Sequence, residues 1–238
     1  MAESRRAIAL VLTAAALAVG AWPSLTEARP SKAPAHAKKK MAGKCVPQKA
    51  QAFLIRANYM RHGSVLPGPL ARTVRYRVEQ YGRVEGAGTA EQNPEMASHF
   101  SVATTFFGLP LQVHEKMAPA LGCVEAEIQH SCQKHPYHPT AVSGFRDHNS
   151  YRGGEITNHL FGLAIDIDPE RNPCCHCVEP WPDHPACQGE KKSAYERMAM
   201  PKCWVDAFEK YGFYWLGRDF LQDTMHFEFL GRPDRVKR

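Results

Sequence analysis

Apolar and polar residues alternate in two short stretches of the second half of the chain. In residues 163–168 Leu and Ile alternate with Ala and Asp, and in residues 224–230 Met and Phe alternate with Thr, His and Glu. Because successive side chains of a strand point to opposite faces, both stretches predict strands with one face in the core. Asp166 and His226 then lie on the faces turned away from the core. Residues 137–144 and 213–216 are predicted to form two further strands.

Apolar residues recur at helical spacing in four other stretches, namely residues 48–60, 94–108, 111–129 and 194–211. Pro94 and Gly108 are expected to begin and end the second helix, Pro119 to kink the third, and Gly212 to end the fourth. Residues 61–93 have no clean period and are expected to be irregular. Helices mixed with short strands, with little strict alternation, predict an α+β fold. We expect a small antiparallel sheet, flanked by helices, in a single domain.

The first 44 residues differ in composition from the remainder. Arg5 and Arg6 precede a nearly continuous apolar run in residues 7–21, which is too short for a confident membrane span. Residues 1–28 are therefore predicted to be a signal peptide, with a retained anchor as the alternative. Residues 29–44 carry six basic side chains and no acidic one, which predicts a basic flexible linker.

The basic linker accounts for the charge of the whole chain. The formal net charge is +6, yet residues 45–238 contain 22 basic and 22 acidic side chains and are neutral overall. The folded part therefore offers no basic face typical of nucleic-acid binding. Weak attraction of the linker to an anionic cell envelope and a simple contribution to solubility both remain open.

All eight cysteines follow the predicted leader, and an even number in an exported chain predicts disulfides. The pairing cannot be deduced from the sequence. Several of these cysteines lie in a Cys- and Pro-rich insertion at residues 173–188, which also contains His176 and His184. A structural zinc knuckle is the alternative there, but the spacing is irregular and an oxidising compartment favours disulfides. We expect a secreted or periplasmic protein of the cell envelope, without a stable membrane span in its mature form.

Two histidines and an aspartate are placed so that they could hold a metal. His159 sits on the turn before the strand that carries Asp166, and His226 lies on the last predicted strand. Two imidazoles and one carboxylate are a common ligand set for catalytic zinc, which leaves one coordination position open. We therefore predict that His159, Asp166 and His226 bind one Zn²⁺.

At these residues the chain resembles the zinc D-alanyl-D-alanine carboxypeptidases, whose superfamily includes L-alanyl-D-glutamate endopeptidases and, more distantly, hedgehog-type and lysostaphin-type domains. The shared pattern is an Arg after a Gly-aromatic pair, then Ser-x-His-x-x-Gly-x-Ala-x-Asp, then Asp or Glu three residues before a final His. It is represented here by Gly144-Phe145-Arg146, by residues 158–166 and by Asp223-Thr224-Met225-His226. The Ser-x-His part is not kept, and the Cys-rich insertion is a second departure.

Four further residues have expected roles, and the resemblance implies those of the first two. Asp223 corresponds to the acid or base that takes a proton from water and passes it to the leaving amine. Arg146 corresponds to a cation that holds the developing oxyanion or a substrate carboxylate. Glu228, on the face of His226, could orient that ligand. Asp168 precedes Pro169 and is interpreted as a turn former rather than a ligand.

These residues predict a zinc metallopeptidase that cleaves peptidoglycan stem peptides, as a D-alanyl-D-alanine carboxypeptidase. One alternative is an endopeptidase that cuts an L-alanyl-D-glutamate or cross-bridge bond. A second is a non-catalytic zinc-containing module that binds the cell wall, and a third is a disulfide-knotted envelope protein with a structural metal. Peptidoglycan peptides are the predicted partner, and the oligomeric state is left open.

Overall fold

The strands predicted to carry Asp166 and His226 form the centre of a four-stranded antiparallel sheet. Its order is β5 (Val142–Ser143), β6 (Ala164–Ile167), β8 (His226–Phe229) and β7 (Phe213–Trp215). The computed structural model describes residues 45–61, 64–151, 155–177, 181–190 and 193–235. The predicted signal peptide and basic linker therefore lie outside the described residues.

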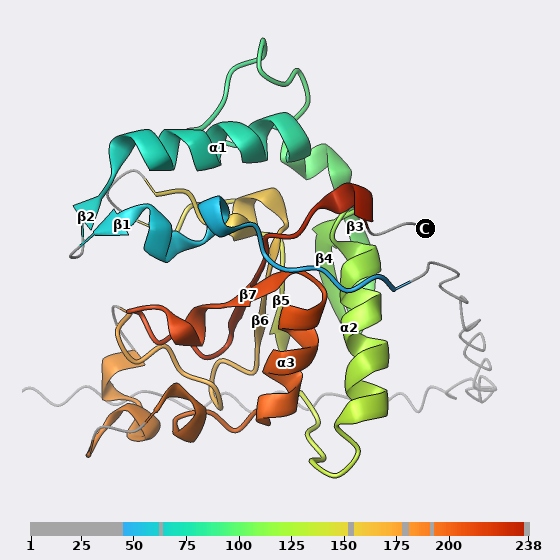
Figure 1. The fold of residues 1–238 in the computed structure, drawn as a ribbon, viewed down its shortest axis with the longest axis vertical. Coiled ribbons are helices and arrows are strands. Elements are labelled where there is room, and N and C mark those ends of the chain that lie inside the picture. Colours follow the sequence, from blue (N-terminus) through green and yellow to red (C-terminus); the bar gives the residue numbers. More distant parts are fainter. Residues whose placement is uncertain (1–44, 62–63, 152–154, 178–180, 191–192, 236–238) are drawn as a thin grey trace, which may run out of the picture. The chain divides into compact units, whose positions relative to one another are not determined.

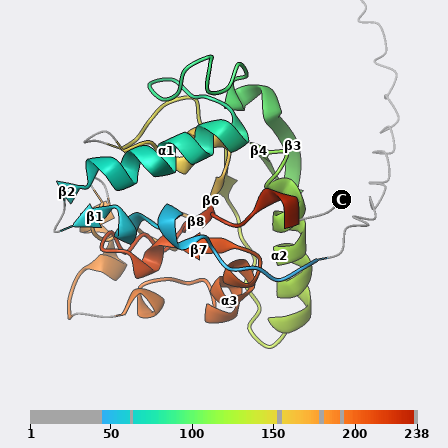
Figure 2. The same ribbon diagram turned by 45° about the horizontal axis from the view of Figure 1, so that its top comes forward.

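Helices cover both faces of this sheet. On one face α3 (Lys202–Lys210) packs beside α2 (Ala118–Ser131), and Phe208 of α3 stacks on Phe227 of β8 with ring centroids 4.0 Å apart. On the other side lies α1 (Pro67–Tyr81), as Figures 1 and 2 show. All eight residues of β6 and β8 are buried. The predicted α+β class is confirmed, and His226 points away from the aromatic core formed by Phe208 and Phe227.

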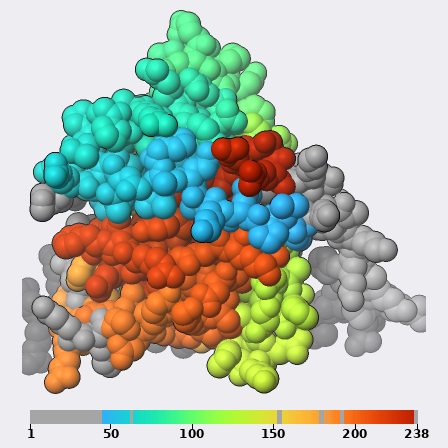
Figure 3. Space-filling model, viewed as in Figure 1, coloured from blue at the N-terminus to red at the C-terminus, as the bar shows by residue number. Residues whose placement is uncertain are grey.

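The predicted N-terminal helix over residues 48–60 is wrong. The segment contains two 3₁₀ turns, Ala52–Leu54 and Arg56–Asn58, joined by extended backbone at Ile55. Its backbone pairs with distant parts of the chain instead: Gln48 N–H donates to Lys210 O and Gln51 N–H to Leu230 O, both at 2.9 Å. Figure 3 shows this segment lying against the C-terminal part of the chain. Tertiary hydrogen bonds thus replace the helical ones that the apolar spacing suggested.

The expectation that residues 61–93 are irregular is wrong as well, because they contain α1. Pro67 lies in its first turn and Gly82, with φ 98°, follows its last residue. The buried face of α1 includes Thr73 and Arg77 next to Val78 and Tyr81. Polar residues on the inward face conceal the apolar period, so the pattern alone does not show this helix.

A β-hairpin replaces the helix predicted for residues 94–108. After a 3₁₀ turn at Ala97–Phe100, β3 (Ser101–Phe106) pairs with β4 (Leu109–His114). Phe107 and Gly108 connect the strands, and both have positive φ, 50° and 81°. A two-residue turn of this kind matches the twist of paired strands. The stripe of apolar residues at steps of three and four was therefore misleading.

The remaining elements are shorter than the sequence predicts. Helix α2 begins at Ala118, so Pro119 lies in its first turn and does not kink it. Helix α3 covers only the end of the predicted range 194–211, because Pro201 precedes its first residue. The other short elements are β1 (Met60–Arg61), β2 (Ser64–Val65) and 3₁₀ turns at Asn158–Phe161, Trp181–Asp183, Pro185–Cys187, Ala194–Glu196, Leu216–Arg218 and Pro233–Arg235.

Four disulfides pair all eight cysteines. Cys45–Cys123 joins the N-terminal segment to α2, and Cys132–Cys203 joins the end of α2 to α3. Cys174–Cys177 and Cys175–Cys187 lie within the predicted insertion. Disulfides are therefore favoured over the zinc knuckle, and they are typical of exported proteins. Within the described residues, no helix has the length and apolar character needed to cross a membrane.

Candidate metal and catalytic site

Two hydrogen bonds hold His159, one to its backbone and one to its ring. The Thr157 hydroxyl accepts a hydrogen bond from His159 N–H at 3.3 Å and so caps the 3₁₀ turn Asn158–Phe161. The imidazole Nδ1 lies 2.5 Å from Gly144 O. A carbonyl can only accept, so Nδ1 carries the proton and Nε2 of a neutral ring presents its lone pair. Thr157 thus occupies the position of the Ser in the family pattern, but its hydroxyl bonds the backbone of His159 rather than its ring.

Gly162 ends this turn at a position that other residues would not tolerate. Its φ is 66°, and a Cβ added there would lie 2.6 Å from the backbone nitrogen of His114. The close approach lets His114 N–H donate to Gly162 O at 2.8 Å. The hairpin strand β4 thus braces the turn that carries His159.

Strand register places Asp166 and His226 directly opposite each other. They are paired residues of β6 and β8, and Asp166 Oδ1 lies 2.7 Å from His226 Nδ1. His159 Nε2 lies 3.2 Å from Asp166 Oδ2 and 3.2 Å from His226 Nδ1. All three side chains are buried, with at most 3% exposure. The structure therefore brings the three predicted ligands together.

The second ring nitrogen of His226 also faces an acceptor. His226 Nε2 lies 3.4 Å from Glu228 Oε1 and donates to it, while Nδ1 points toward Asp166 and His159. Glu228 is two residues along β8 and is buried. Both histidines thus have one nitrogen fixed by an oxygen and the other aimed at a common point. This arrangement is typical of metal-binding histidines.

Electrostatics favour a positive charge at that point. Burial opposes the imidazolium, but the carboxylates of Asp166 and Glu228 raise the pKa of His226 to about 10. Burial lowers the pKa of His159, so this ring is held neutral. Burial raises the pKa of Asp166, but the two histidines together lower it well below its usual range. A proton on His226 Nδ1 faces two acceptors, Asp166 Oδ1 and His159 Nε2, and a metal cation could take its place.

The donor set fits a divalent metal. Ligand atoms of His159, Asp166 and His226 all lie within 4.8 Å of one another, as they must to share an ion. Two nitrogens and one carboxylate oxygen suit zinc, and three protein ligands leave a position open.

Arg146 lies closer to this group than the sequence indicated. Its Nη2 is hydrogen-bonded to Asp166 Oδ2, and its backbone N–H donates to His159 O at 3.1 Å. The side chain is 31% exposed, unlike the three buried ligands. Arg146 therefore stands at the solvent side of the group, where its guanidinium neutralises the Asp166 carboxylate.

Asp223 is buried beside the same charges but has a free oxygen. Its exposure is 9%, and Oδ1 has no hydrogen-bond partner among the described residues. Burial raises the pKa of Asp223 to about 7, with the charges of Asp166 and Glu228 acting in the same direction and those of His226 and Arg146 against it. A carboxyl group that titrates near neutral pH can both accept and release a proton.

Comparison with known families bears on the segment that carries these residues. Residues 151–229 match the family model described as D-alanyl-D-alanine carboxypeptidase. The match covers about a third of the chain and includes His159, Asp166, Asp223 and His226, whereas Arg146 precedes it. It confirms the resemblance found in the sequence and indicates a peptidase of this type. No curated protein and no solved structure matches the chain significantly.

Two supporting groups of the site were missed in the sequence. The Gly144 carbonyl, which fixes the His159 ring, has no side chain to signal it. Thr157 could have been found, because it stands two residues before His159, where the family pattern has Ser. Asp168, interpreted as a turn former, accepts from Tyr137 Oη at 2.6 Å and from backbone N–H groups of residues 140 and 141.

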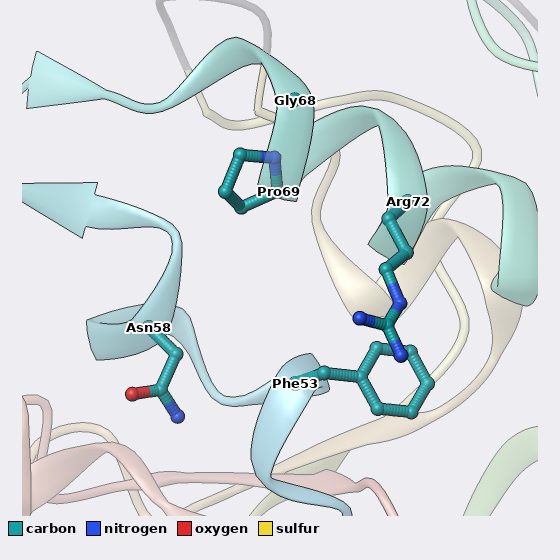
Figure 4. Close-up of a pocket in the computed structure, with 5 residues that line it drawn as sticks. All are labelled: Phe53, Asn58, Gly68, Pro69 and Arg72. Atoms are coloured by element: carbon teal, nitrogen blue, oxygen red, sulfur yellow. The ribbon is translucent and has the colours of Figure 1, made fainter.

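Two surface pockets lie away from the predicted metal ligands. One of about 380 Å³ is lined by Phe53, Asn58, Gly68, Pro69 and Arg72, between the N-terminal segment and the start of α1 (Figure 4). The Arg72 guanidinium lies 4.6 Å from the centre of the Phe53 ring. A second, of about 430 Å³, borders the same helix from Pro67 to Arg75. Neither is lined by the predicted metal ligands, so they do not mark the candidate site.

Proposed function

We propose that this protein is a zinc-dependent peptidase that cleaves peptidoglycan stem peptides, as a D-alanyl-D-alanine carboxypeptidase. The observation that supports this most is the convergence of His159 Nε2, Asp166 and His226 Nδ1 in a segment that matches that peptidase family. Zinc bound there would polarise the scissile carbonyl and lower the pKa of a water molecule. The disulfides and the predicted signal peptide support action outside the cytoplasm, where peptidoglycan is found.

The chain's own residues supply the remaining chemistry. Asp223 Oδ1 is free to accept a proton from the attacking water, and the raised pKa of this carboxyl lets it release that proton to the leaving amine. Glu228 holds the Nε2 proton of His226, so that Nδ1 stays directed at the site. These roles need no movement of the sheet, because Asp166, His226 and Glu228 lie on its two central strands.

Arg146 is the cation that a carboxypeptidase requires for the free end of its substrate. It is the exposed member of the group, and its planar guanidinium can bind a carboxylate with two hydrogen bonds. Such binding would compete with its present bond to Asp166 Oδ2. Substrate binding would therefore require the guanidinium to turn from Asp166 toward the substrate carboxylate.

Mass spectrometry of purified muropeptides after digestion tests the proposal. We expect loss of one terminal Ala from pentapeptide stems, abolished by a chelator and restored by zinc. Peptides with an amidated terminal Ala should be poor substrates if Arg146 binds the carboxylate. Stems released from glycan, or opened cross-bridges, would instead identify an endopeptidase.

Asp223→Asn separates catalysis from metal binding. It removes the proton acceptor while leaving His159, Asp166 and His226 in place, so turnover should fall by about 10²-fold or more with one zinc still bound. His159→Gln is the matched variant that should lose zinc as well, measured by metal content after dialysis. Unchanged turnover in Asp223→Asn would remove this residue from the mechanism, and wild-type protein that binds zinc but cleaves no muropeptide would favour a binding module.

A further inference from the structure

The Cys-rich insertion packs against the segment that carries Asp223. Cys174 and Asp223 form an antiparallel bridge, and Thr224 N–H and Oγ1 donate to Pro173 O at 3.2 and 2.9 Å. His176 N–H donates to Leu221 O at 2.9 Å. The backbone that positions the candidate catalytic carboxylate is therefore supported by the insertion as well as by the main sheet, from which Trp215 Nε1 donates to Thr224 O at 2.9 Å.

One disulfide of the insertion lies directly beside that carboxylate. The sulfurs of Cys174 and Cys177 and a carboxylate oxygen of Asp223 lie within 4.8 Å of one another. Cys174 is fully buried. In the disulfide neither sulfur carries a proton, so neither can donate to Asp223, and Asp223 Oδ1 indeed has no partner among the described residues. Two thiols at the same place would offer S–H donors to the Asp223 carboxylate.

The position of this disulfide argues against a role in global stability. It joins residues only three apart, whereas Cys45–Cys123 and Cys132–Cys203 span 78 and 71 residues. A cross-link across so short a loop restricts the unfolded chain least. Its effect should therefore be local, on the turn that faces Asp223.

We propose that the Cys174–Cys177 disulfide is a positioning element for Asp223, and that cleavage therefore requires this pair to be oxidised. The inference rests on the proposed function, because Asp223 matters only if the protein is a peptidase. The oxidised pair fixes the turn opposite Asp223 and leaves the Asp223 carboxylate free to accept a proton from the attacking water. Reduction adds two electrons and two protons to the sulfurs, frees the turn and places thiol donors next to the carboxylate.

The test compares two double variants of the full-length chain. Cys174→Ala with Cys177→Ala removes the proposed positioning disulfide without adding hydrogen-bond donors. Cys175→Ala with Cys187→Ala removes the other disulfide of the insertion and is the matched control. We expect the first variant to lose about 10- to 100-fold in kcat, the effect of a slightly misplaced catalytic group, with KM and bound zinc unchanged. The control should stay within about twofold of wild type.

Hydrogen exchange provides a readout independent of activity. Backbone amides of residues 221–225 should exchange faster in the first variant than in wild type or the control, because the turn that holds them is released. Equal exchange in all three proteins would overturn the inference. So would an unchanged kcat, a loss of zinc that accounts for the loss of activity, or equal losses in both variants. Absence of cleavage by wild type would refute the proposed function, while the exchange data would still decide the positioning role.

Reduction of the wild-type protein covers the case in which the first variant does not fold. Dithiothreitol, which is oxidised to its cyclic disulfide, would be added stepwise under native conditions, and free thiols identified by alkylation and mass spectrometry. Activity should fall in proportion to the reduced fraction of Cys174–Cys177 and return on reoxidation. Activity that persists after this pair is fully reduced would contradict the inference.

Discussion

Replacing His114 by Gln should make the stability of the protein less sensitive to acid. The His114 ring is 1% exposed, its Nε2 lies 3.1 Å from Tyr81 O, and its Nδ1 accepts from Lys116 N–H at 3.0 Å. Protonation of Nδ1 would therefore break the hydrogen bond from Lys116 N–H. Burial and the Lys116 charge lower the pKa of His114 to about 4, although the hydrogen bond to Tyr81 O acts in the opposite direction.

The size of the effect follows from the difference between that pKa and the ordinary value of 6.5. The unfolded chain binds a proton at this histidine as pH falls below about 6.5, and the folded chain binds it only near pH 4. The free energy of unfolding should therefore fall across this range, by about 1.4 kcal/mol per pKa unit, or about 3 kcal/mol in total. Above pH 6.5 the group contributes no pH dependence.

Urea unfolding followed by tryptophan fluorescence at several pH values from 7 to 4 measures this contribution. A chelator present in all samples prevents pH-dependent metal binding from contributing. The disulfides are left intact, so that every sample unfolds between the same two states. His114→Gln lowers stability at pH 7 because the ring contacts are lost, but its free energy should decline by about 3 kcal/mol less than that of wild type on going to pH 4. Parallel pH profiles for the two proteins would refute the reasoning.

Three further changes test separate parts of the site. Glu228→Gln leaves the site folded but weakens the acceptor for His226 Nε2, so zinc affinity should fall by about 10- to 100-fold in a competition titration with a chromophoric chelator; unchanged affinity would contradict the role of Glu228. Asp168→Asn places an amide among the donors that surround the carboxylate and should cost about 2–3 kcal/mol in urea unfolding. The exposed Asp206→Asn is its control, expected to cost less than about 1 kcal/mol. Gly162→Ala meets both a positive φ and the backbone of β4, so a loss of at least about 1 kcal/mol is expected, and a neutral result would mean that the turn can shift.

Local pattern predicted the part of the fold that carries the candidate site. Strands β6 and β8 alternate regularly, so their residues and the outward face of His226 could be predicted. The hairpin β3–β4 could not, because apolar side chains in residues 96–107 also satisfy a helical period. The turn at Phe107–Gly108, with two positive φ values, decided between them.

Contacts between distant segments account for the other failures. Helix α1 was missed because Arg77 lies on its buried face. Residues 48–60 were mispredicted as a helix because their backbone pairs with Lys210 and Leu230 instead. The three predicted metal ligands were found from residue types and spacing, and the structure brings them together. Their partner at Gly144 O and the pairing of eight cysteines depend on packing that no local pattern records.

Strands β6 and β8 are the inner pair of the sheet, and each is hydrogen-bonded on both sides. Backbone amides in such strands exchange with solvent only when a large part of a domain opens. The geometry around Asp166 and His226 should therefore persist for as long as the protein stays folded, with or without a bound metal. If the proposed site binds zinc, metal-free protein should take it up at a rate set by diffusion and ligand deprotonation, with no slow refolding step.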